Sequence, residues 1–311
     1  DPLSHLAKAS ATPEKDLRGS MNTKTLYRQT SFTNSDFPFS IKQIRTQNGQ
    51  PDILFHWHTD IEIIYVNEGT AQFHIDYEYF HSQPGDIILI RPNALHSIHP
   101  IQSSSHTMDV LHFNLDLIGI THKNIATLKY LQPLYNGDFE FVRRIQVQSP
   151  GYEEIKQSLL NCMANGREQG PFYELRLKSQ LNELLYLLFS HHYIVEKKFS
   201  TDAYRREEKI RLVLDHISNH YQEELMIEQL ADLCHFSPTH FMNFFKKQLG
   251  ISCMEYIIQY RLKKAAHFLQ HSDLAIIDIA SQSGFNNLSN FNRQFKKYYQ
   301  TTPSQYRKAC L

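Results

Sequence analysis

This chain of 311 residues has few cysteines, no net charge and no long apolar run. The four cysteines are scattered without the spacing of a metal or redox motif: Cys162, Cys234, Cys253 and Cys310. Such a distribution is typical of reduced thiols, and we expect a cytoplasmic protein. No apolar stretch approaches the roughly 20 residues that span a bilayer, so the sequence indicates no membrane segment.

The net charge of zero hides an asymmetry between the two parts of the chain. Residues 205–311 contain 14 Lys and Arg against 10 Asp and Glu, whereas residues 21–204 contain 15 against 19. A basic C-terminal part suits a polyanionic partner, and an acidic N-terminal part does not. Residues 1–20 have neither a basic start nor an apolar core, so we interpret them as an expression scar rather than a secretory signal.

Short apolar runs separated by turn residues fill the chain between Ile41 and about Leu117. Pairs such as Asn48-Gly49 and Pro84-Gly85 mark the turns. The clearest strand candidates are Ile53–Phe55, Glu62–Val66, Ala71–Ile75 and Asp86–Ile90. Short strands at regular spacing predict a β-barrel or a double-sheet jelly roll.

Leucine-rich helical patterns follow in residues 151–195. Their apolar residues recur at helical spacing, most densely from Leu175 to Leu188. One stripe of such a helix serves as core, and a second stripe is available to pack against a partner subunit. Core packing alone and dimerisation are therefore both open.

The last hundred residues contain one sequence unit twice. Leu230-Ala231, a turn and Phe245-Lys246-Lys247 correspond to Ile279-Ala280, a turn and Phe295-Lys296-Lys297. The offset is 49 residues before the turn (231 to 280) and 50 after it (245 to 295), so one residue is added in or just after the second turn. A small residue on one helix, a tight turn and a second helix are typical of a helix-turn-helix. Two in tandem predict contact with neighbouring major-groove segments of DNA.

Each second helix has to bury one face and present the other. The expected buried residues are aromatic or leucine: Phe241, Phe244, Phe245 and Leu249, then Phe291, Phe295 and Tyr298. The candidates for reading bases are Thr239, His240, Met242, Asn243, Ser289, Asn290, Asn292 and Arg293, since Asn suits adenine and Arg suits guanine. The phosphate candidates are Lys246, Lys247, Lys296 and Lys297. The alternative is that these lysine pairs are only solvated helix surface.

The stretch from about Arg211 to Lys308 resembles the DNA-binding domain of AraC/XylS-type transcriptional regulators. The most specific elements are Ala280–Phe285, Phe291–Lys297 and Thr302–Arg307. The resemblance implies a bacterial regulator that places one recognition helix of each unit in consecutive major grooves. Its expected partners are a double-stranded DNA operator and RNA polymerase. Asn243 stands where arginine is frequent in the family, so a guanine contact is not implied there.

A second resemblance lies in the strand-rich part. His56-Trp57-His58, Glu62 and Gly69 give His-x-His-x3-Glu-x6-Gly, and a later segment runs from Pro84 to His96. This resembles the two cupin motifs, although Arg91 and Asn93 replace the usual proline and glycine of the second. Regulators of this type commonly keep the cupin barrel as a pocket for a small effector.

The sequence suits two kinds of ligand for this barrel, a metal ion and a small effector. His56 and His58 are two apart on a strand and so share a face, while Trp57 is expected to pack outside. The metal-ligand candidates are His56, His58, Glu62 and His96, which would suit a divalent transition metal. The effector-contact candidates are Arg45, His56, His58, Glu62, Arg91 and His96, a polar set that favours a sugar over an apolar ligand.

We therefore expect an α+β multidomain protein with a cupin-like β-barrel, a helical dimerisation segment and an all-α domain of two helix-turn-helix units joined by a long helix. The expected boundaries are 1–20 for the scar, 21–150 for the effector domain with its N-terminal arm, 151–195 for dimerisation, 196–208 for a linker and 209–311 for DNA binding.

The expected function is regulation of a small-metabolite, carbohydrate-utilisation operon by an effector-responsive homodimeric activator. We expect no enzymatic activity and no required cofactor. Two alternatives stay open: a metal-dependent cupin enzyme fused to a DNA-binding module, and a ligand-independent dimeric regulator.

Overall fold

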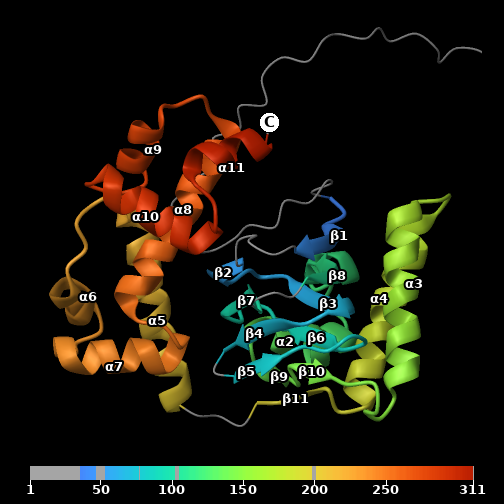
Figure 1. Cartoon of the computed structure of the whole chain (residues 1–311). Coiled ribbons are helices and arrows are strands. Elements are labelled where there is room, and N and C mark those ends of the chain that lie inside the picture. The colour runs from blue at the N-terminus through green and yellow to red at the C-terminus, as the bar shows by residue number, and fades with distance from the viewer. Residues whose placement is uncertain (1–35, 47–52, 77, 102–104, 198–200, 311) are drawn as a thin grey trace, which may run out of the picture.

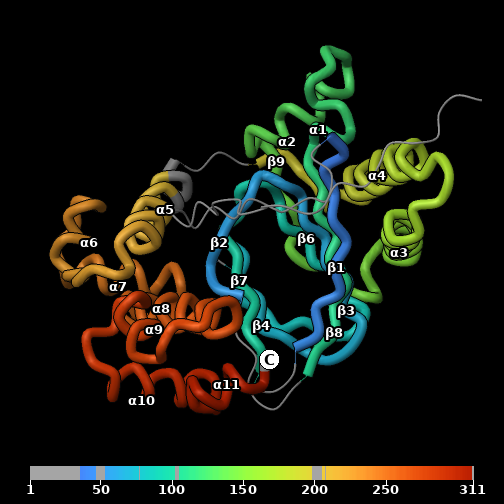
Figure 2. Tube along the Cα trace, turned by 90° about the horizontal axis from the view of Figure 1, so that it is seen from above, coloured from blue at the N-terminus to red at the C-terminus, as the bar shows by residue number. Residues whose placement is uncertain are grey.

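The computed structural model describes residues 36–46, 53–76, 78–101, 105–197 and 201–310. Its helical C-terminal part lies on one side of a central β-barrel, and two long helices cover the opposite side (Figure 1). Seen from above, the strands of the barrel form a ring (Figure 2). This arrangement confirms the predicted fold class.

Two antiparallel sheets form the barrel. The five-stranded sheet has the order β1 (Phe39–Thr46), β8 (His106–Phe113), β3 (Ile61–Gly69), β6 (Ile87–Ile90) and β10 (Arg144–Ile145). The four-stranded sheet has the order β2 (Ile53–His56), β7 (His96–Pro100), β4 (Ala71–Ile75) and β5 (Glu78–His81). A separate pair joins β9 (Phe139–Phe141) to β11 (Ile194–Glu196).

The alternation of side chains along β3 separates two cores. Ile64 and Val66 belong to the core inside the barrel, whereas Ile61 and Ile63 belong to the core against the covering helices. Successive strand residues point to opposite faces of a sheet. Glu62 therefore shares the inward face with Ile64, which places a carboxylate inside the barrel.

The covering helices are α3 (Tyr152–Glu168) and α4 (Tyr173–Ser190). They follow three short helices on the connection from β8: α1 (Leu115–Ile118), η1 (Thr127–Leu131) and α2 (Gln132–Asn136). Most of the predicted leucine stripe is buried in the core of this chain: Leu177, Leu181, Leu184, Leu185 and Leu188. Leu175, in contrast, is 73% exposed.

The C-terminal part is all-helical. Its elements are α5 (Thr201–His220), α6 (Ile227–Leu233), α7 (Pro238–Leu249), α8 (Cys253–His271), α9 (Ile276–Gln282), α10 (Leu288–Tyr299) and α11 (Pro303–Cys310). Four residues separate α6 from α7 and five separate α9 from α10, so the added residue lies in the second turn.

Two predictions about these helices were wrong. Helix α5 begins at Thr201, inside the segment 196–208 expected to be a linker. Arg, Glu and Lys have high helix propensity, so polarity alone does not indicate a linker. Tyr298 is only partly buried, and its neighbour Tyr299 is packed in the core of the second unit instead.

The four strand candidates of the sequence correspond to β2, β3, β4 and β6. Cys162, Cys234 and Cys253 are buried free thiols. Within the described ranges, no helix is both long and apolar enough to cross a bilayer.

Candidate functional site

The first recognition helix, α7, has well-formed ends and a free outer face. Ser237 Oγ accepts a hydrogen bond from the His240 backbone N–H at 3.4 Å, with Pro238 at the first helical position. Proline fits there because that N–H has no partner within the helix. All four predicted base-reading residues and both lysines are exposed: Thr239, His240, Met242, Asn243, Lys246 and Lys247. The predicted buried set, from Phe241 to Leu249, is buried.

The second recognition helix, α10, is built in the same way. Asn287 Oδ1 accepts from the Asn290 backbone N–H at 2.9 Å and caps the helix. The predicted reading residues and lysines are exposed here too: Ser289, Asn290, Asn292, Arg293, Lys296 and Lys297. Arg293 Nη2 donates to Asn290 Oδ1 at 3.0 Å, which holds the guanidinium over the N-terminal turn.

Helix α8 joins the two units into one body. Its first half, including Tyr256 and Ile257, packs in the core of the first unit, and its second half, including Ala265 and Leu269, packs in the core of the second. In the middle, Arg261 donates to the carbonyls of Tyr221 and Glu223, each at 2.7 Å. The two recognition helices therefore have a fixed relative position, as tandem major-groove reading requires.

Inside the barrel, three imidazoles converge on one carboxylate oxygen. The Nε2 atoms of His58, His96 and His112 lie 2.9, 3.1 and 3.3 Å from Glu62 Oε2. His56 lies beside them, with its ring centroid 4.1 Å from that of His96. We call His56, His58, Glu62, His96 and His112 the histidine cluster. Two cross-strand pairs form it, His56 with His96 and Glu62 with His112, one on each sheet.

Electrostatic interactions within the cluster favour a protonated His58 and an ionised Glu62. Burial by itself lowers the pKa of His58, but the hydrogen bond and charge of Glu62 outweigh it, so that pKa is raised above 6.5. Burial raises the pKa of Glu62, yet His112, His58 and His96 together hold it well below 4.5. The carboxylate is thus ionised, and the buried negative charge is compensated by imidazole.

The cluster fits a divalent metal ion. The ligand atoms of His56, His58 and His96 all lie within 4.8 Å of one another, and so do those of His58, Glu62 and His112. The Nδ1 atoms of His56, His58 and His96 lie 2.9–3.1 Å from backbone carbonyls, of Leu54, Asp60 and Ala94. Such contacts orient the rings of metal-ligating histidines and leave Nε2 for the ion. Imidazole nitrogens with a carboxylate suit transition metals.

Four of the six predicted effector contacts meet in this cluster, and two do not. Arg45 is exposed on β1, where its Nε donates to Gln43 Oε1 at 3.0 Å. Arg91 is buried and forms an ion pair with Asp76 at 3.2 Å. The prediction missed His112, which shares the inward face of β8 with Val110 and Met108. Alternation along the strand predicts that the His112 side chain points inward, but not that it meets Glu62.

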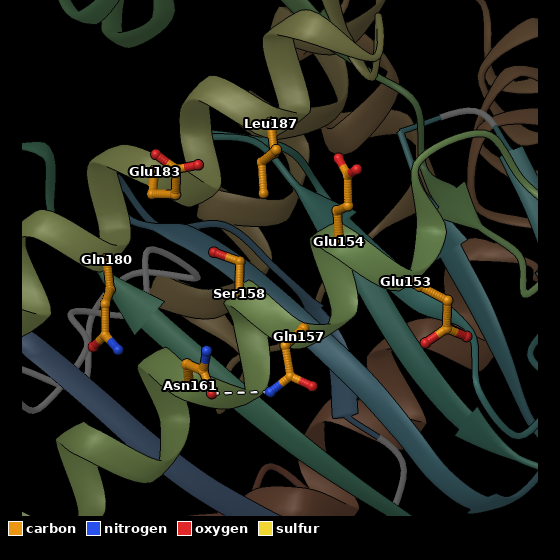
Figure 3. A pocket seen from close by; sticks show the side chains of 8 residues that line it. All are labelled: Glu153, Glu154, Gln157, Ser158, Asn161, Gln180, Glu183 and Leu187. Atoms are coloured by element: carbon orange, nitrogen blue, oxygen red, sulfur yellow. Dashed lines mark hydrogen bonds between the residues drawn. The ribbon is translucent and has the colours of Figure 1, made fainter.

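A shallow surface pocket of about 650 Å³ lies elsewhere, between α3 and α4. Its lining is mostly acidic or amide and lies on the outer surface of these helices (Figure 3): Glu153, Glu154, Gln157, Ser158, Asn161, Gln180, Glu183 and Leu187. It shares no residue with the histidine cluster, so it plays no part in the candidate site.

Two tandem helix-turn-helix units beside a barrel with a buried polar cluster define a two-domain DNA-binding regulator with a ligand-binding barrel. Family models support both parts: an AraC-like ligand binding domain matches residues 40–185, and a helix-turn-helix domain matches residues 230–309. The chain belongs to the AraC/XylS-type transcriptional regulators.

Several individual proteins are similar to parts or most of this chain. The HTH-type transcriptional regulator YdeC of Bacillus subtilis, itself uncharacterised, is 23% identical over 84% of this chain and 88% of its own. An HTH-type regulator of Staphylococcus aureus is 30% identical over 42% of this chain, which spans only 18% of that longer protein. The crystal structure of the C-terminal domain of the response regulator YesN from Fusobacterium nucleatum is 34% identical, with 32% of this chain and 98% of that domain covered and a TM-score of 0.31.

Proposed function

We propose that this protein is an effector-responsive, sequence-specific regulator that activates a small-metabolite utilisation operon in the cytoplasm. One observation carries the DNA-binding part. The residues suited to reading bases are exposed on both α7 and α10, while every phenylalanine of the same helices is buried. Exposed Asn and Arg side chains on a helix can reach base edges in the major groove.

Selection of duplexes from a random-sequence library by the full chain tests this proposal. We expect a bipartite site with two contacted segments about one helical turn, roughly 34 Å, apart. The affinity should fall steeply with salt, because lysines such as Lys246 and Lys296 displace counterions from phosphates. Recovery of unrelated sequences after repeated rounds would contradict sequence-specific recognition.

The histidine cluster is the proposed effector site. Its buried polar groups orient a ligand by hydrogen bonds, and a polyhydroxylated metabolite such as a sugar matches the imidazoles and the Glu62 carboxylate. A divalent transition metal is the second candidate, favoured by the short separations among the ligand atoms. Bound by His56, His58 and His96 or by His58, Glu62 and His112, such an ion would supply positive charge beside the Glu62 carboxylate.

Two measurements separate these candidates. A ligand that binds only the folded chain raises its thermal stability by mass action, so a thermal-shift series of sugars and of Zn²⁺, Mn²⁺ and Ni²⁺ identifies the class. His112→Gln should weaken the response to the true ligand, whereas exposed His122→Gln should not. No stabilisation by either class would favour the ligand-independent regulator instead. Turnover that depends on a stoichiometric metal would favour the cupin enzyme.

A further inference from the structure

The outer face of the four-stranded sheet is packed against the first helix-turn-helix unit. Leu54, Phe55, Trp57 and Leu95 of the barrel share one buried apolar cluster with residues of α5, α6, α7 and α8. The ring centroids of Phe55 and Tyr256 are 6.4 Å apart. Figures 1 and 2 both show β2, β4 and β7 on the side of the barrel that faces these helices. We call this contact the docking interface.

Polar contacts reinforce the docking interface at one point. Arg211 on α5 donates from Nη2 to the backbone carbonyl of Asn93. Its guanidinium carbon also lies 5.4 Å from the centre of the Trp57 ring, a cation–π arrangement. The apolar core of the second unit, in contrast, contains only residues of α8 to α11. Residues on the outer face of the barrel therefore share an apolar core with the first unit and not with the second.

The same two chain segments line both the docking interface and the histidine cluster. In Leu54–His58, the imidazoles of His56 and His58 point inward while Phe55 and Trp57 point to the helices. In Asn93–His96, Leu95 packs in the docking interface and His96 joins the cluster. The Asn93 N–H donates to the His58 carbonyl at 2.7 Å, and the Asn93 carbonyl accepts from Arg211. The backbone of Asn93 thus links His58, a residue of the histidine cluster, to Arg211 on α5.

We propose that segments Leu54–His58 and Asn93–His96 couple the histidine cluster to the position of the first helix-turn-helix unit, so that a change at the cluster alters its docking. Close-packed side chains on opposite faces of one strand cannot move independently. Both recognition faces stay exposed in the docked arrangement, so the coupling acts through the position of the unit rather than by covering its reading face. As a route for effector signalling, it rests on the proposed function of the cluster.

The coupling is measurable without DNA or effector. His112 lies on the five-stranded sheet, so an effect of His112→Gln on α5 has to travel through the cluster. We expect amide hydrogen exchange in α5 to rise about fivefold or more, as for a typical coupling between sites. Exchange in α3, on the opposite side of the barrel, should stay unchanged, and His122→Gln should leave both helices as in the parent chain. An unchanged α5, or an equal rise in α3 and α5, would overturn the proposal.

A double-mutant cycle measures the coupling at the DNA. The dissociation constant for a duplex selected by the full chain is compared among the parent, His112→Gln, Arg211→Ala and the double variant. We expect the effects to be non-additive by about fivefold, because Arg211→Ala removes the hydrogen bond to Asn93 and the cation–π contact with Trp57 that link α5 to the two segments. In the matched cycle with Arg206→Ala, exposed on the same helix, the effects should add. Additivity in both cycles would refute the coupling. Failure to select any duplex would refute the proposed DNA recognition, while the exchange result still decides the coupling.

Discussion

At the scale of single residues, the two recognition helices differ in how they present their reading groups. Arg293 on α10 is held by Asn290, and a guanidinium offers two parallel donors to guanine. The corresponding part of α7 presents Met242 and Asn243, which lack such a fork. The second unit therefore has the stronger base-specific contact available.

We predict that Arg293→Ala relaxes sequence specificity more than Asn243→Ala does. Loss of a bidentate arginine contact typically costs about 1–3 kcal/mol of discrimination at one base pair. Competition binding against duplexes changed at single positions measures it. Lys297→Ala is the control, because loss of a phosphate contact weakens all sequences alike. Equal losses of discrimination in the Arg293 and Asn243 variants would contradict the prediction.

A second residue-scale prediction concerns His74 on the outer face of β4. Its ring stacks on Tyr79 at 3.7 Å between centroids and meets Phe55 edge-on at 4.6 Å. Neither ring nitrogen has a hydrogen-bond partner among the described residues. Burial, together with the neighbouring His99, lowers the pKa of His74 to about 3, despite the opposing effect of Asp76.

Because the unfolded chain binds this proton near pH 6.5 and the folded chain only near pH 3, acidification through that range favours unfolding. Stability should fall by about 1.4 kcal/mol per pH unit from this one group. His74→Phe should remove that part of the slope between pH 6 and 4 in urea titrations of the full chain. His122→Gln should keep it. A slope unchanged by His74→Phe would show that His74 accepts its proton in the folded state.

At the scale of elements, the turns of the two helix-turn-helix units both contain a residue in the left-handed conformation, but the residue type differs. Gly284 has φ +85°, and an added Cβ would collide with the Tyr221 carbonyl. His235 occupies the equivalent turn with φ +56°, a left-handed conformation that costs a side-chain-bearing residue energy. The first turn is therefore strained where the second is relaxed.

His235→Gly should stabilise the chain by about 0.5–1 kcal/mol, because relief of left-handed strain exceeds the added backbone entropy of glycine. The same replacement at His240, within right-handed α7, should destabilise by about 1 kcal/mol. Gly284→Ala should cost about 2 kcal/mol or more through strain and collision. Urea unfolding followed by helical circular dichroism measures all three. A destabilising His235→Gly would contradict this account of the turn.

Local sequence patterns predicted the helices and strands better than they predicted the contacts between them. Alternation identified β2, β3, β4 and β6, and the repeated helix-turn-helix unit located α7. The cupin-like spacing predicted that His56, His58, Glu62 and His96 lie together, and the structure places them in one cluster. Two further effector candidates are placed differently: Arg45 points outward because Ile44 points in, and Arg91 pairs with Asp76. His112 was missed because it joins the cluster only through pairing of β8 with β3, a non-local contact that spacing does not encode.

At the scale of the whole molecule, the layers assign separate roles to the two sides of the barrel. The four-stranded sheet is packed against the first helix-turn-helix unit, and the five-stranded sheet is packed against α3 and α4. Neither of these contacts involves the outer surface of α4. Phe172, at the N-cap of α4, and Leu175 and Tyr186 within the helix are 79%, 73% and 62% exposed. Their stripe lies opposite the buried leucines of the same helix.

We predict that this stripe is the contact between two copies of the chain, as its apolar character favours. Leu175→Glu should shift the chain from dimer to monomer in sedimentation experiments without loss of helical circular dichroism, because a buried carboxylate without a partner is costly. Arg176→Glu places a carboxylate on the same turn outside the stripe and should leave the dimer intact. The monomeric variant should also bind a duplex with two operator half-sites more weakly, since linked units bind the second half-site at high effective concentration. A parent chain that sediments as a monomer at micromolar concentration would assign the stripe another role.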